Sequence, residues 1–268
     1  MKDKRVLYVS SEVIPYLPET EISSMSFEAP RAVNSKEGQI RIFMPRYGNI
    51  NERRHQLHEV IRLSGMNLVI NDLDMPLIIK VASIPKERMQ VYFIENDDYF
   101  KRKATYADED GTFYDDNDER AIFFAKGVIE TVKKLNWSPD IIHVHGWLAS
   151  FLPLYLKKYY GNEPLFENSK IVTSVYNQGF DGTLDKEIVS KITFDGIEED
   201  EISELKDPTY NNVMKIAIKN SDAIIIGSEE IPEEIETYLK KIDAPVLKFH
   251  NKEEFQEAYI DFYTQLLD

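Results

Sequence analysis

Short apolar runs recur along this chain and alternate with segments whose apolar residues have helical spacing. The runs have the length and β-branched content of strands buried on both faces of a parallel sheet, and they cover residues 5–10, 39–44, 140–145, 170–175 and 223–227. Helices are expected at residues 27–36, 118–135, 147–160, 211–220 and 253–267, with a further segment at 232–242. This alternation predicts an α/β fold, a Rossmann-like doubly wound parallel sheet with helices on both faces.

Helix ends and loops follow from turn residues. Gly38 is the expected left-handed cap of the first helix, and Asp116 or Asn117 is the expected N-cap of the helix over 118–135. Residues 11–25 and 45–48 are expected to be loops after the first two strands. A short apolar segment, 245–247, lies before the last helix. No repeat or linker is visible, so residues 1–268 are expected to form one domain.

The pattern of hydrophobic and polar residues changes between residues 61 and 95. Three extended segments, 61–69, 77–83 and 90–94, are separated by turn residues and predict an antiparallel meander inserted into the α/β frame. The polar loop 97–116 follows, and it is expected to expose its aromatic residues, with docking on the domain as the alternative; these are Tyr99, Phe100, Tyr106, Phe113 and Tyr114. Residues 195–204 are strongly acidic and are interpreted as a solvated segment rather than a metal site.

The stretch PDIIHVHGWLAS, residues 139–150, carries the most specific chemistry. A buried strand ends in His143 and His145, which strand alternation places on one face, and the chain turns at Gly146 toward a helix. In an open parallel sheet, ligands bind at the carboxyl ends of the strands, so this edge is the expected site. A His-x-His pair without a third ligand nearby is weak evidence for a metal, and no metal or cofactor is expected.

Composition and charge exclude several classes of function. A net charge of -15 opposes binding to nucleic acid or to anionic membranes, because either needs clustered Lys and Arg. The absence of cysteine removes disulfides and thiolate sites. Glu12 interrupts the only early apolar run, and no run reaches the length of a membrane span, so a cytoplasmic location is expected.

Over about its first 240 residues the chain resembles the N-terminal half of bacterial glycogen synthases and plant starch synthases, the glycosyltransferase family 5 type. The resemblance rests on four stretches in order: VLYVSSEVIPY from Val6, MPRYGNI from Met44, KVASIPKERMQVYFIENDDYF from Lys80 and PDIIHVHGWLASFLP from Pro139. NSDAIIIGSEEIPEEI, at 220–235, resembles a later landmark. The resemblance implies one half of a GT-B fold, and transfer of glucose from a nucleotide sugar to an α-1,4-glucan.

Departures from the family pattern affect the donor side. Where the family has Lys-Thr-Gly-Gly-Leu and then an Asp, this chain has Pro-Glu-Thr-Glu-Ile at 18–22 and then Ser24. An acidic loop without glycine repels a pyrophosphate and cannot bring backbone amides close to it. Of the family's His-Asp-Trp-His pattern only His145 and Trp147 remain, and Tyr176 replaces a histidine before Asn177. The family's C-terminal donor-binding domain is expected to be absent.

The resemblance nominates ligand-binding residues but no catalytic residue. Glu12 and His145 are candidate sugar contacts, and Asn177 matches a family position. Trp147 is a candidate for stacking on a sugar ring, with a core position as the alternative. Arg46 and Tyr47 are candidates for ligand contact, with bracing of their loop as the alternative.

Two functions are therefore expected as alternatives. The favoured one is a degenerate relative that binds α-glucan, malto-oligosaccharide or a protein partner, a second copy included, without ADP-glucose and without transferring glucose alone. The other is an active glycogen synthase subunit that transfers glucose from ADP-glucose to α-1,4-glucan together with a separate donor-domain chain.

Overall fold

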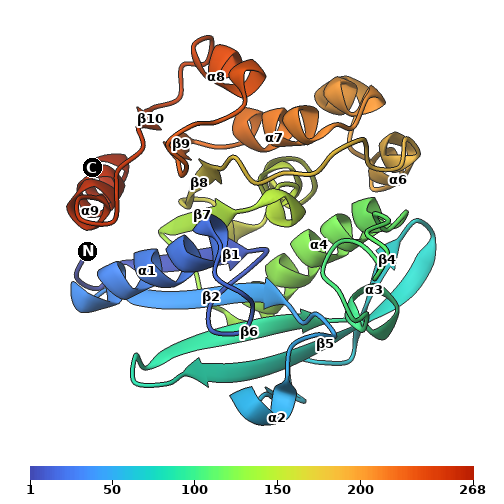
Figure 1. Ribbon diagram of the computed structural model, residues 1–268, viewed down its shortest axis with the longest axis horizontal. Coiled ribbons are helices and arrows are strands. Elements are labelled where there is room, and N and C mark those ends of the chain that lie inside the picture. The colour runs from blue at the N-terminus through green and yellow to red at the C-terminus, as the bar shows by residue number, and fades with distance from the viewer.

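A single mixed sheet runs through the protein, as the computed structural model of residues 1–268 shows (Figure 1). Its strand order is β10-β9-β8-β7-β1-β2-β6-β5-β3, and β4 pairs with β5 at the margin. Every neighbouring pair from β10 to β6 is parallel, and the pairs beyond β6 are antiparallel. The predicted doubly wound α/β fold is confirmed.

The strands match the predicted apolar runs closely in the parallel half. They are β1 (Arg5–Ser10), β2 (Gln39–Pro45), β3 (His58–Glu59), β4 (Met66–Ile70), β5 (Leu73–Ile84), β6 (Met89–Glu95), β7 (Ile141–His145), β8 (Lys170–Val175), β9 (Ala223–Ile226) and β10 (Val246–Leu247). β1 lies at the centre of the parallel half, between β2 and β7, and all but one of its six residues are buried. A core of buried apolar side chains extends from β1 to the last helix.

Helices cover both faces of the sheet (Figure 1). The helices are α1 (Glu21–Ser35), α2 (Glu52–His55), α3 (Asp97–Phe100), α4 (Asn117–Leu135), α5 (Leu152–Leu154), α6 (Ile188–Phe194), α7 (Tyr210–Lys219), α8 (Glu233–Leu239) and α9 (Phe255–Leu267). Helices α1 and α9 pack together on one face, whereas α4, α5 and α7 pack together on the other. No helix is both long and apolar enough to cross a membrane.

The meander is antiparallel as predicted, but its first strand is shorter. β4 begins at Met66, and residues 61–63 form a turn in which Ile61 is 83% exposed. Ser64 and Gly65 directly after it favour the turn over a strand. β6 pairs in parallel with β2 and antiparallel with β5, so it joins the meander to the parallel half.

The first helix begins six residues earlier than predicted. Thr20 is its N-cap and forms a capping box with Ser23, so that much of the expected loop 11–25 is helical. At the other end Glu37, not Gly38, takes the left-handed conformation, with φ of 61°. Glycine is needed at position 38 for a steric reason instead, because a Cβ there would lie 2.5 Å from Cγ1 of Val33.

The expected helix over 147–160 is broken into three pieces. A 3-10 turn at Trp147–Ala149, α5 at Leu152–Leu154 and a π-helical turn at Tyr155–Tyr159 follow one another. Pro153 explains the break, because it has no N–H to donate and is tolerated only in the first turn of a new helix.

Two segments expected at the surface are partly buried. Asp195 is not solvated: its carboxylate lies 2.8 Å from Nζ of Lys126 and accepts a hydrogen bond from Tyr155. In the loop 97–116, Tyr99 is 3% exposed and Phe100 is fully buried, so docking on the domain, and not exposure, describes these rings. The loop has no regular pattern of apolar residues, so its packing could not be predicted from the sequence.

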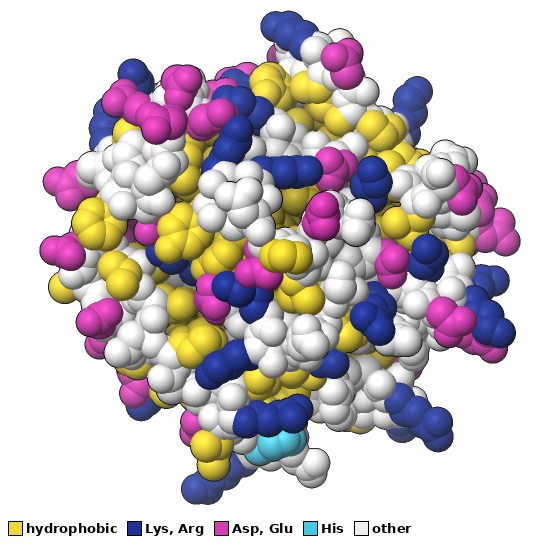
Figure 2. Space-filling model, turned by 180° about the vertical axis from the view of Figure 1, so that it is seen from behind, with side chains coloured by type: hydrophobic (Ala, Val, Ile, Leu, Met, Phe, Trp, Pro, Cys, Tyr) yellow, Lys and Arg dark blue, Asp and Glu magenta, His cyan; other side chains and the backbone are white.

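The surface carries charges of both signs. Lys and Arg side chains lie among Asp and Glu side chains over the face seen from behind, rather than in one basic patch (Figure 2). Two further 3-10 segments are Pro164–Phe166 and Glu199–Lys206, and Glu199 and Asp200 are exposed as predicted for the acidic stretch.

Candidate functional site

The carboxyl ends of β1, β7 and β8 meet at one edge of the sheet. Ser10 pairs in register with His145, and His145 pairs with Ser174. The loops that follow these strands carry Glu12, Gly146 and Asn177. The sheet therefore brings together three of the candidates predicted from the sequence, Glu12, His145 and Asn177.

Glu12 lies at the centre of a hydrogen-bond network that joins three loops. Its Oε1 accepts hydrogen bonds from the Tyr106 hydroxyl at 3.0 Å and from Nε2 of Gln178 at 3.0 Å. Its Oε2 accepts from Oγ1 of Thr20 at 2.7 Å and from the same Gln178 amide at 3.1 Å. The side chain is 6% exposed, so the carboxylate fixes the positions of these loops and has little surface for a ligand.

His143 and His145 are fully buried and in contact, with ring centroids 3.9 Å apart and ring planes tilted by 40°. His143 bridges the Tyr263 hydroxyl of α9, at 2.6 Å, and the Ser174 hydroxyl, at 2.7 Å. His145 Nδ1 lies 2.7 Å from the Tyr176 hydroxyl, and its Nε2 has no partner in the protein. Burial lowers the pKa of His145 to about 3 and holds the pKa of His143 well below 6.5, so both rings are neutral.

Gly146 permits the turn that follows the histidines. Its φ is 82°, and a Cβ there would overlap Oγ of Ser11 and lie 3.0 Å from its Cβ. Only glycine satisfies both the left-handed backbone and this close approach to the β1 loop.

Trp147 is a core residue and not an open platform. It is 2% exposed, and its ring lies 5.0 Å from the ring of Tyr106, 5.7 Å from that of Phe113 and 5.0 Å from that of Phe180. These rings hold the loop 97–116 against the loop after β8.

Arg46 and Tyr47 brace the loop after β2. Arg46 pairs with Glu52 of α2, and its Nε lies 3.7 Å from Glu95 at the end of β6. Tyr47 is fully buried, with its ring 5.8 Å from that of Phe100. Neither side chain presents a free polar group to solvent at the strand edge.

Asn177 differs from the other candidates because it is exposed. Its backbone N–H donates to Oγ of Ser228 at 2.9 Å, and Ser228 in turn donates to the Glu21 carboxylate. Its position is therefore fixed through the backbone while its amide faces solvent.

The N-terminus of α1 is closed by its own residues. Thr20 Oγ1 accepts from the N–H of Ser23 at 3.0 Å, and Ser23 Oγ accepts from the N–H of Thr20 at 2.8 Å. Glu19 and Glu21 flank this box and are both exposed. The capping box uses the N–H of Ser23, and the carboxylates of Glu19 and Glu21 add negative charge, so this helix end is less suited to a phosphate than an uncapped, neutral one.

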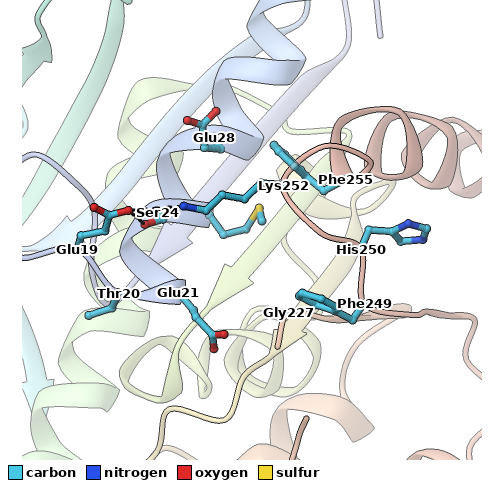
Figure 3. A pocket seen from close by; sticks show the side chains of 11 residues that line it. Glu19, Thr20, Glu21, Ser24, Glu28, Gly227, Phe249, His250, Lys252 and Phe255 are labelled. Atoms are coloured by element: carbon cyan, nitrogen blue, oxygen red, sulfur yellow. Dashed lines mark hydrogen bonds and ion pairs between the residues drawn. The ribbon is translucent and has the colours of Figure 1, made fainter. Parts of the chain in front are cut away.

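A cavity of about 300 Å³ lies beside this helix end (Figure 3). Its walls come from α1 and from residues 249–255, which lead into α9. No group of His, Asp and Glu side chains in the protein is arranged to hold a metal ion.

Three partners in this site were not anticipated from the sequence. Tyr106, Gln178 and Thr20 hold Glu12, although Gln178 lies 166 residues away from it. The one available signal was that Gln178 directly follows Asn177 in the loop after β8.

The sequence of this chain matches a family model described as the starch synthase catalytic domain over residues 5–244. It is 34% identical to a glycogen synthase of Chlorobium luteolum over 236 residues, which cover 87% of this chain and 47% of that protein. It is 39% identical to a glycogen synthase of Chlorobium limicola over 189 residues, which cover 70% of this chain and 39% of that protein.

Among solved structures, the fold is similar to the catalytic domain of starch synthase IV from Arabidopsis thaliana bound to ADP and acarbose. The TM-score is 0.69 at 18% identity, and the match covers 98% of this chain and 50% of that one. The chain thus spans about half the length of the proteins it matches.

Proposed function

This chain belongs to the starch synthase catalytic domain family, and from that membership we propose that it binds α-glucan at the carboxyl edge of its sheet without transferring glucose by itself. The observation that carries the proposal is the closed N-terminus of α1. The Thr20–Ser23 capping box uses the N–H groups of these two residues, and Glu19 and Glu21 add negative charge. A nucleotide diphosphate would meet repulsion at this point instead of hydrogen-bond donors.

The glucan part of the proposal rests on family membership and on the built edge of the sheet. Asn177 offers an exposed amide on a backbone that Ser228 holds in place. We assign direct contact with the ligand to Asn177. Glu12 and His145 are positioning residues in this proposal, because both are buried and bonded to the loops that present Asn177. A relative's structure bound to acarbose is consistent with an oligosaccharide at this fold.

Titration calorimetry with maltoheptaose and with ADP-glucose tests this function. We expect saturable binding of maltoheptaose and none of ADP-glucose. Asn177→Ala should weaken maltoheptaose binding about tenfold, since it removes hydrogen bonds to the ligand. The matched control is Asn67→Ala, which removes an exposed amide on β4, far from the edge. Tight binding of ADP-glucose, or an equal effect of both variants, would contradict the proposal.

A second function is favoured by one observation, the coverage of about half of each relative. In this alternative the chain is an active subunit that transfers glucose from ADP-glucose to α-1,4-glucan with a separate donor-domain chain. Its test is release of ADP when the protein is mixed with ADP-glucose, glycogen and candidate partner chains. Release that falls on Asn177→Ala would support the alternative, and silence in every mixture would leave the first proposal standing.

A further inference from the structure

The cavity between α1 and residues 249–255 has a strongly polarised lining (Figure 3). Carboxylates line the side that α1 and the loop before it provide, namely Glu19, Glu21 and Glu28. Apolar side chains from both walls, Met25, Phe249 and Phe255, line the rest. The cavity therefore pairs negative charge with aromatic surface, and neither feature is used by the edge network around Glu12.

Positive charge in the cavity only partly offsets these carboxylates. Lys252 Nζ lies 3.6 Å from Glu19 Oε1, but the two side chains are 79% and 70% exposed, so solvent screens the pair. Arg31 pairs with Glu28 at 2.6 Å from outside this lining. His250 points away from α1 (Figure 3). Glu21 has no cationic partner, and its contact is with the Ser228 hydroxyl.

The aromatic side chains are placed to contact a ligand. Phe249 is 36% exposed, which is unusual for a phenyl ring and leaves part of its surface free in the cavity. Phe255 is 2% exposed, and it anchors the start of α9 as the cavity wall. A cation beside a phenyl face gains electrostatic attraction in addition to burial of its apolar part.

Size and geometry narrow the class of ligand. A volume of about 300 Å³ is at the small end of small-molecule pockets, which span roughly 300–1,000 Å³. The carboxylates do not converge on a point, so a bare metal ion finds no ligand set here. An anion would meet three carboxylates in the lining.

We propose that this cavity is a binding site for a small organic cation, an ammonium group carried on an apolar or aromatic body. The ammonium lies beside the Glu21 carboxylate, which has no cationic partner in the protein, and the body packs on Phe249 and Met25. Asn177, the proposed glucan contact, is not part of this lining, and the two places are linked only through Ser228, which bonds to Glu21 and to the Asn177 backbone.

Calorimetric titration of the whole chain with phenethylamine and spermidine tests the site. The control 2-phenylethanol has an aromatic body without a charge, and the control magnesium chloride supplies a small cation without an organic body. We expect one saturable site for at least one of the two amines, and none for phenylethanol or magnesium. Glu19→Gln combined with Glu21→Gln should weaken the amine at least tenfold. The control pair Glu198→Gln and Asp200→Asn removes the same charge from two exposed side chains that form no ion pair, leaves the neighbouring Glu199–Lys206 pair intact, and should change nothing.

A phenylalanine variant and its control complete the experiment. Phe249→Ala should also weaken the amine, whereas Phe194→Ala, on an exposed ring of α6, should not. Equal effects of the cavity and control variants, binding of phenylethanol as tight as the amine, or no saturable amine binding would each overturn the proposal. Maltoheptaose binding, measured separately, reports on the glucan site, so failure of one proposal is distinguishable from failure of the other.

Discussion

His143 and His145 make the folded protein sensitive to acid. Both rings are buried and neutral, and burial lowers the pKa of His145 to about 3. The unfolded chain binds protons at these histidines below about pH 6.5, while the folded chain does not. The free energy of unfolding therefore falls as pH decreases from about 6.5, by about 1.4 kcal/mol per pH unit for each histidine.

Urea unfolding between pH 7 and pH 5 measures this dependence. His145→Gln should remove the part of the slope that belongs to His145. The exposed His58 serves as the control, because His58→Gln removes a histidine that solvent reaches in the folded state. If both variants keep the slope of the parent chain, buried neutral histidines are not its cause.

Gly146 is constrained by space as well as by backbone conformation. Gly146→Ala should lower the free energy of unfolding by about 3 kcal/mol or more, because a Cβ would overlap the Ser11 side chain at a φ of 82°. Gly182→Ala is a matched control: its φ is 78°, but nothing lies within 4 Å of the added Cβ. This control should lose only the free energy needed to place alanine at a positive φ, about 1–2 kcal/mol. Equal losses in chemical denaturation would contradict a steric role for Gly146.

Among the secondary-structure elements, α4 is tied to the segment after α6 by a buried ion pair. Lys126 and Asp195 lie 2.8 Å apart with side chains 4% and 7% exposed. Lys126→Met should destabilise the protein by about 3–5 kcal/mol, because it leaves the Asp195 carboxylate buried without a cation. Lys101→Met breaks a pair that is 60% and 58% exposed and should cost about 0–1 kcal/mol. Thermal unfolding compares the two, and similar melting temperatures would refute the argument.

Sequence patterns predicted the parallel half of the fold well because its strands are buried on both faces and read as uninterrupted apolar runs. They failed where a local interaction or a break decided the element. The capping box at Thr20 starts α1 early, and Pro153 breaks the segment over 147–160. Neither event changes the apolar spacing, which is the signal that the prediction used.

The candidate site, like the fold, was predicted only in part. The strand-edge position of His145 and Glu12 follows from topology, since parallel strands end at one edge. Their partners do not, because Tyr106 and Tyr176 reach them across 94 and 31 residues of chain. Burial of Trp147 likewise depends on Phe113 and Phe180, rings of two separate loops.

The whole molecule has one continuous core, and this predicts cooperative unfolding. The 74 residues of that core run from β1 to α9 without a division. Far-ultraviolet circular dichroism and tryptophan fluorescence should therefore give coincident urea transitions, since the two tryptophans and the helices belong to one unit. Transitions with separate midpoints would contradict a single domain.

The central position of β1 has a consequence for biosynthesis. Arg5 donates its N–H to Asp140, 135 residues later in the chain. At about 5–20 residues per second, the ribosome needs roughly 7 to 27 seconds to make the partner strand. During that time one edge of β1, composed largely of apolar residues, has no native neighbour and is exposed to pairing with other nascent chains. We therefore expect the yield of the newly made protein to depend on chaperones that shield the first strands until β7 has left the ribosome.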